Sequence, residues 1–162
     1  MGKSGPDCGQ RPAQRLAVSN VFLGTHTHNL DAKGRLAIPA RFRDGVGAES
    51  VLTRGADQCL VIYPPDPWRS LCARIEMLPL SDHDARMYRR FLFSDAMTLE
   101  PDGQGRILLP AELREYASID RNVVVVGMES VIEVWAADAW DAIHQRLDAQ
   151  ADEIIGRLGS MI

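Results

Sequence analysis

The sequence predicts an α+β fold, mostly β, in which two tandem copies of one short unit carry peripheral helices. Three observations predict it: a motif repeated at a constant offset, short β-branched segments bounded by glycine-containing turns, and amphipathic segments after each group of strands. The chain of 162 residues is 46% hydrophobic, which suits a globular protein with a real core. One unit alone buries little apolar surface, so we expect the two copies to intertwine around a shared core.

The repeat is clearest where residues 31–43 read DAKGRLAIPARFR and residues 102–114 read DGQGRILLPAELR. Asp, Gly, Arg, Pro, Ala and the final Arg match at an offset of 71. Further along, with one residue inserted, Tyr63 matches Trp135. Each copy is therefore expected to fold as a strand, a glycine turn, a short apolar strand, a Pro-initiated turn of helix, two more strands and a helix.

The strands follow from apolar runs. Residues 36–38 and 107–109 are apolar throughout, which predicts strands buried on both faces, as in a small barrel. Hairpins are predicted where β-branched runs bracket a glycine-containing turn, at residues 51–53 with 59–63 and at residues 123–126 with 131–135.

The helices follow from capping residues and apolar spacing. Asp66 is expected to cap, and Pro67 to open, a helix after the first copy, and a similar helix is expected to begin near Asp138 after the second. Between them, Ser81–Asp84 resembles a capping box and predicts a connector helix that has no counterpart in the repeat.

These elements predict five segments along the chain. They are a disordered leader rich in Gly, Ser, Pro and Gln over residues 1–20, a first unit over 21–80, a connector helix over 81–92, a second unit over 93–140, and a C-terminal helix with a tail over 138–162.

Charge and motifs exclude several functional classes. The net charge of -4 argues against a chain coated in basic residues, so any contact with DNA must be local. The apolar runs fall far short of the roughly 20 residues that cross a bilayer, so no membrane partner is expected. No nucleophile elbow, P-loop or dinucleotide-binding fingerprint is present, so we expect neither an enzyme nor a cofactor.

Basic residues gather in the first copy. Residues 31–43 hold Lys33, Arg35, Arg41 and Arg43, whereas residues 129–153 hold seven acids against one arginine. This cluster predicts a local DNA contact, and a merely solvated basic face is the alternative.

The Asp-x-x-Gly-Arg motif has a chemistry of its own. Its aspartate can accept bonds from backbone N–H groups two residues on, and its glycine can take a positive φ, so Asp31 with Gly34, and Asp102 with Gly105, are expected to form tight turns. The arginine that follows, Arg35 or Arg106, can then reach a phosphate or the edge of a guanine.

An alternative role for these arginines stays open on the sequence alone: each can pair with the aspartate of its own turn and only stabilise it. The two copies also differ, because the second copy offers Gln104, Glu112 and Glu115 where the first is basic. If one copy dominates contact with DNA, it is the first.

His26 and His28 point to the same side of a predicted strand and so raise the question of a metal. No second pair of Cys, His or carboxylate residues with matching spacing completes a ligand set, so no metal site is expected and ordinary strand histidines or phosphate contacts are favoured.

Both motif copies resemble the MraZ family, through FLGT at residues 22–25, NLDAKGRLAIP at 29–39 and DGQGRILLP at 102–110. The likeness runs from about Phe22 to about Leu147. It implies a tandem pair of swapped-hairpin β units like those of the AbrB group of regulators, assembled into a homo-oligomeric ring, in a nucleoid-associated protein. A cytoplasmic place is expected because the three cysteines are odd in number and form no C-x-x-C pair, which suits reduced thiols.

The resemblance also implies a function. Members repress their own division and cell-wall gene cluster by gripping short G-rich direct repeats in double-stranded DNA upstream of it. By position, Arg35 and Arg106 inherit the DNA contact, and Lys33 joins them as a phosphate neighbour. A ring lets several weak contacts add along tandem repeats.

The leader departs from the family pattern, because members usually begin at the residue before Phe22. That residue here is Val21, which a GTG start codon would encode internally. We hypothesise that residues 1–20 are a mis-called start, and peptide masses beginning at Met1 would overturn this.

Two other functions remain to be weighed against a repressor. An antitoxin-like module would bind a toxin partner as well as DNA, although duplication within one chain and the lack of a long toxin-wrapping tail count against it. A ring-forming scaffold or enzyme subunit would make no contact with DNA.

Overall fold

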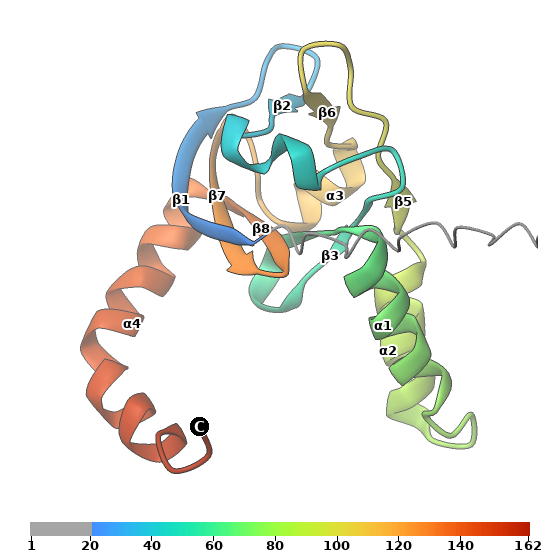
Figure 1. The fold of residues 1–162 in the computed structure, drawn as a ribbon, viewed down its shortest axis with the longest axis vertical. Coiled ribbons are helices and arrows are strands. Elements are labelled where there is room, and N and C mark those ends of the chain that lie inside the picture. Colours follow the sequence, from blue (N-terminus) through green and yellow to red (C-terminus); the bar gives the residue numbers. More distant parts are fainter. Residues whose placement is uncertain (1–20) are drawn as a thin grey trace, which may run out of the picture.

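The structure is a computed structural model that describes residues 21–162, so the predicted leader over residues 1–20 lies outside the described residues. The elements run in the order β1 (Phe22–Asn29), β2 (Arg35–Ala37), η1 (Ala40–Gly45), β3 (Val51–Arg54), η2 (Ala56–Gln58), β4 (Leu60–Tyr63), α1 (Pro65–Glu76), α2 (His83–Phe93), β5 (Met97–Thr98), β6 (Arg106–Leu108), α3 (Ala111–Tyr116), β7 (Asn122–Glu129), β8 (Val131–Ala136) and α4 (Ala137–Leu158). The fold is α+β with a mostly antiparallel sheet, as predicted (Figure 1).

The two copies exchange their first strands. The main sheet has the order β1-β7-β8-β4-β3-β5, so β1 of the first copy lies beside β7 of the second, and β5 of the second lies beside β3 of the first. The remaining short strands, β2 and β6, pair with each other. Every pairing between the copies is antiparallel. The expected intertwining is confirmed, while closure of the strands into a barrel stays a prediction.

A shared core forms where the copies meet. Leu36 of β2 lies opposite Ile107 of β6, and neither side chain is exposed to solvent. The prediction that residues 107–109 are buried on both faces is wrong, because Leu108 is 50% exposed. Successive side chains of a strand point to opposite faces, and Leu108 lies opposite Arg35 on the outer face.

Two predicted caps are corrected. α1 begins at Pro65 without a side-chain cap, because the N-cap residue is Pro64, whose side chain has no atom that can accept a hydrogen bond. Asp66 pairs with Arg69 instead. At the connector helix α2 the cap is not Ser81 but the next residue, Asp82, whose carboxylate accepts a bond of 2.9 Å from the N–H of Ala85. A carboxylate suits the partly positive N-terminus of a helix.

Three helices extend away from the strands: α1 and α2 on one side of the molecule and α4 on the other (Figure 1). α4 packs its first turns against β7 and β8 through residues such as Trp140 and Ile143. Its last turns carry exposed apolar side chains, Ile155 and Leu158 among them. Within residues 21–162, none of the helices combines the length and the apolar character that a membrane span requires.

Candidate nucleic-acid interface

The two motif loops lie side by side at the end of the molecule opposite to the free ends of the helices (Figure 1). The pairing of β2 with β6 places them there, because Arg35 begins β2, Arg106 begins β6, and the two strands are antiparallel neighbours. The guanidinium of Arg35 lies 3.8 Å from the carboxylate of Asp102, and that of Arg106 lies 3.7 Å from the carboxylate of Asp31. Four charges of two copies thus meet in one cluster.

The first loop is closed by its aspartate. Oδ1 of Asp31 accepts from the backbone N–H groups of Lys33 and Arg35, each at 2.9 Å, and Oδ2 accepts from Nε of Arg35 at 2.7 Å. Gly34 has a φ of 76°, a conformation that costs most other residues free energy. Its N–H donates to the carbonyl of Asp31 at 3.0 Å.

The second loop repeats this geometry. Asp102 accepts from the backbone N–H groups of Gln104 and Arg106 at 2.9 and 3.0 Å, and from Nε of Arg106 at 2.8 Å. Gly105 has a φ of 71°. Each aspartate and glycine of the motif therefore shapes its own turn, and each arginine is oriented through one nitrogen.

The hydrogen bonds keep both aspartates charged. The backbone N–H of Arg106, followed by the side chain of Arg106, lowers the pKa of Asp102 to about 2. The same groups of Arg35 lower the pKa of Asp31. Because both carboxylates stay ionised at neutral pH, they balance the two motif arginines, and any surplus of positive charge at this end must come from other residues.

A second pair of arginines braces the loops across the copies. Nε of Arg43 donates to the carbonyl of Ile38, and Nε of Arg114 donates to that of Leu109, both at 3.0 Å. Each guanidinium then packs on the glycine of the other copy. A Cβ atom at Gly105 would lie 2.9 Å from Nε of Arg43, and one at Gly34 would lie 3.3 Å from Nε of Arg114.

The other predicted DNA contacts lie at the surface of this end. Lys33 is exposed at the tip of the first loop, and Arg41 is exposed on η1. The side chain of Arg35 is 30% exposed and that of Arg106 is 27% exposed. Each motif arginine therefore pairs with the aspartate of its own turn, which is the alternative that the sequence left open. This pairing occupies Nε and leaves part of each guanidinium at the surface.

The two histidines of β1 face η1. The ring of His26 packs edge-on against Phe42 with 5.1 Å between the centroids. Burial, then His26 and Arg43, lower the pKa of His28, which favours its neutral form. Among residues 21–162, no group of three or more His, Cys, Asp and Glu residues is arranged to hold a metal ion.

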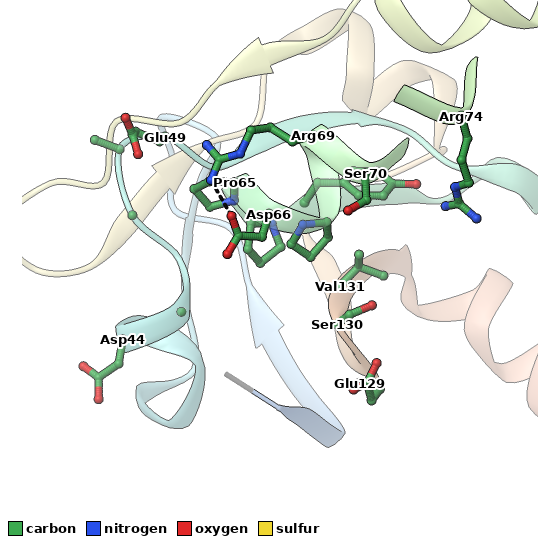
Figure 2. Close-up of a pocket in the computed structure, with 16 residues that line it drawn as sticks. Asp44, Glu49, Pro65, Asp66, Arg69, Ser70, Arg74, Glu129, Ser130 and Val131 are labelled. Carbon is green, nitrogen blue, oxygen red and sulfur yellow. Dashed lines mark hydrogen bonds and ion pairs between the residues drawn. The ribbon is translucent and has the colours of Figure 1, made fainter. Parts of the chain in front are cut away.

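A hollow of about 850 Å³ lies at the far end of β7 from the motif loops (Figure 2). Four acids line it, namely Asp44, Glu49, Asp66 and Glu129. Two arginines also line it, and one of them, Arg69, pairs with Asp66. This excess of acids does not suit a phosphate backbone.

A smaller cleft of about 420 Å³ lies beside the first motif loop and contains two basic residues that sequence reasoning missed, Arg114 and Arg121. They are 83 and 90 residues from Asp31 in the sequence. The pairing of β2 with β6 brings Arg114 to the first loop, and the pairing of β1 with β7 brings Arg121 there. No local pattern indicates this proximity. The repeat alignment pairs Arg114 with Arg43, and that match is the one signal that could have found it.

Comparisons with known proteins agree with the duplicated architecture. A family model described as "MraZ protein, putative antitoxin-like" matches residues 21–91 and again residues 92–157. A protein of Thermomicrobium roseum is 49% identical over 88% of this chain and all of its own length. A protein of Herpetosiphon aurantiacus is 51% identical over 82% of this chain and 91% of its own, and one of Desulforamulus reducens is 43% identical over 83% and 94%. All three carry the name "Transcriptional regulator MraZ".

Proposed function

Because the chain belongs to the MraZ family, we propose that it is a DNA-binding transcriptional repressor that binds G-rich direct repeats as an oligomeric ring. Its proposed targets are the division and cell-wall gene cluster and its own promoter. In this proposal the protein is cytoplasmic and associates with the nucleoid. The role is regulatory and not enzymatic. The observation that carries the proposal is the pair of motif loops, which lie next to each other with their arginines partly exposed.

Pre-orientation of the arginines supports a contact with bases. Asp31 holds Nε of Arg35, and Asp102 holds Nε of Arg106, so each guanidinium loses little side-chain freedom when it meets DNA. The outer nitrogens can then bind the O6 and N7 atoms of a guanine, a contact worth roughly 1 to 3 kcal/mol of discrimination against a wrong base. In this proposal Lys33 and Arg41 contact phosphates, and Arg43 adds charge while it braces Gly105.

The surfaces of the helices support self-assembly. α4 carries five acids and two arginines, whereas α2 carries three arginines and one aspartate. Large apolar side chains are also exposed on both sides, including Met77 and Leu80 between α1 and α2, and Ile155 on α4. A head-to-tail contact between α4 of one subunit and α2 of the next would pair opposite charges. Such contacts close into a ring when the rotation allows.

The decisive experiment is a gel-shift titration on the DNA just upstream of the gene. We expect binding at low salt that weakens steeply as salt rises, because phosphate contacts release counterions. Arg35→Ala should abolish the shift, and Arg106→Ala should retain it at least partly, since the first loop has the more basic surroundings.

Arg69→Ala is the matched control, because it removes one arginine from the acidic hollow far from the loops. It should bind like the wild type, and thermal unfolding should show that all three variants are folded. A wild-type protein that fails to shift tandem G-rich repeats would contradict the proposal and favour a scaffold.

A further inference from the structure

The cleft beside the first motif loop is built by both copies. Its walls are Leu30, Asp31, Ala32 and Gly34 from the first copy and Arg114, Asp120 and Arg121 from the second. We call it the Arg121 cleft.

Backbone pairing fixes Arg121 at the root of the first loop. The N–H of Leu30 donates to the carbonyl of Arg121 at 2.8 Å, directly after the last pair of the β1–β7 ladder, Asn29 with Asn122. The motif loop begins at the next residue, Asp31. The side chain of Arg121 is exposed, so its guanidinium can reach a ligand at the mouth of the cleft.

The charges of the cleft favour an anion. Asp31 already accepts three hydrogen bonds from its own loop, and its charge is balanced by Arg35. The remaining charged walls are Arg114 and Arg121 against Asp120. Within the described part of the chain neither of these two arginines forms an ion pair, and Lys33 lies exposed on the same loop.

The equivalent place beside the second loop lacks this feature. There the N–H of Leu99 donates to the carbonyl of Ser50, again at 2.8 Å, so Ser50 occupies the position of Arg121. Ser50 is 0% exposed and accepts a bond from the N–H of Gly47. The second loop therefore has one bracing arginine, Arg43, and no exposed cation at its root.

We propose that Arg121, assisted by Arg114, binds a backbone phosphate of the DNA duplex beside the first motif loop. The second copy thereby completes the DNA contact of the first. This inference rests on the proposed function, because it assumes that the first loop meets DNA. A phosphodiester carries one negative charge and non-bridging oxygens that accept from a guanidinium fork.

The test compares Arg121→Gln with Arg121→Lys, and uses Arg69→Gln as the matched control. Fluorescence anisotropy is measured on the upstream duplex and on a scrambled duplex over a series of salt concentrations. Arg121→Gln should weaken binding to both duplexes by a similar factor, about three- to tenfold at low salt, and should reduce the salt slope by about one for each subunit that makes the contact. Arg121→Lys should keep most of the affinity, because it keeps the charge.

Three results separate the claims. If the wild type binds neither duplex, the proposed function fails and the inference fails with it. If the wild type binds and Arg121→Gln matches Arg69→Gln in affinity and salt slope, this inference alone is overturned. If calorimetry shows that inorganic phosphate saturates the wild type but not Arg121→Gln, while DNA affinity is unchanged, the cleft takes a free anion and the assignment to DNA is overturned.

Discussion

In the first motif loop Nε of Arg35 lies 2.7 Å from Asp31, and in the second Nε of Arg106 lies 2.8 Å from Asp102, so the two ion pairs are alike. Their surroundings are not alike. Lys33 and Arg121 stand on or beside the first loop, where the second has Gln104 and the buried Ser50. The comparison separates the motif from its surroundings. The internal bonds of the motif build the turn in both copies, while the additional cations Lys33 and Arg121 distinguish the first loop from the second.

The largest expected effect compares Gly55 with Gly127, which the repeat aligns at the same offset of 72 as Tyr63 and Trp135. A Cβ at Gly127 would lie 2.4 Å from a backbone atom of Phe22, whereas one at Gly55 would meet only the side chains of Val61 and Cys59 under 3 Å. Backbone yields less readily than side chains, so we expect Gly127→Ala to cost about 3 kcal/mol or more and Gly55→Ala about 1 to 2 kcal/mol.

Urea denaturation followed by circular dichroism measures both values. Equal losses of unfolding free energy would mean that the exchanged strand β1 is no more constrained than the β3–β4 hairpin.

A smaller effect is expected at the motif glycines. Gly34 and Gly105 both have positive φ, so alanine at either should cost roughly 1 to 2 kcal/mol from backbone strain. Gly105→Ala should be the worse of the two, because its Cβ would also press on Nε of Arg43 at 2.9 Å, against 3.3 Å from Arg114 at Gly34. Thermal unfolding of the two variants gives the order, and the reverse order would refute the bracing role of Arg43.

Two substitutions can move a positive charge from the first loop to the second. Lys33→Gln should weaken DNA binding by a few-fold and lower the salt slope by about one per contact, while Gln104→Lys alone should not weaken it. The double variant keeps the net charge and moves it to the second loop. If it binds the upstream duplex as tightly as the wild type in an anisotropy titration, total charge and not location governs affinity.

The smallest effect is a dependence of stability on pH from the motif carboxylates. Hydrogen bonds lower the pKa of Asp102 from 3.8 to about 2, so its contribution is complete above pH 4 and is lost as the pH falls toward 2. Asp102→Asn should flatten this part of the profile of unfolding midpoint against pH. Asp141→Asn, at an exposed site on α4, is the control and should leave the profile as steep as in the wild type.

Much of the fold could be predicted because the repeat indicates which segments fold alike. The two hairpins, the connector helix and the shared core follow from apolar runs, turns and the matching segments of residues 31–43 and 102–114. Two caps and one face of β6 were predicted wrongly. These depend on the residue at which each helix begins and on the direction of one side chain, and composition determines neither.

The candidate site was predictable only where it is local in sequence. Asp31, Gly34 and Arg35 lie within five positions, so their turn chemistry is legible from residue types alone. Arg114 reaches the same loop because β2 pairs with β6, and Arg121 reaches it because β1 pairs with β7. The sequence indicates that the copies share a core without saying which strands pair. The sequence also does not decide whether Arg35 pairs with Asp31, because the same residues serve either role.

The exchange of β1 and β5 bears on how such a chain could arise. A gene encoding a single copy would yield a half-sheet that lacks a neighbour for β1, and two separate polypeptides would have to meet to supply it. Duplication and fusion place both halves on one chain, so that the partner is present at a high effective concentration however scarce the protein is. Pairing then ceases to depend on dosage, and the two halves become free to diverge.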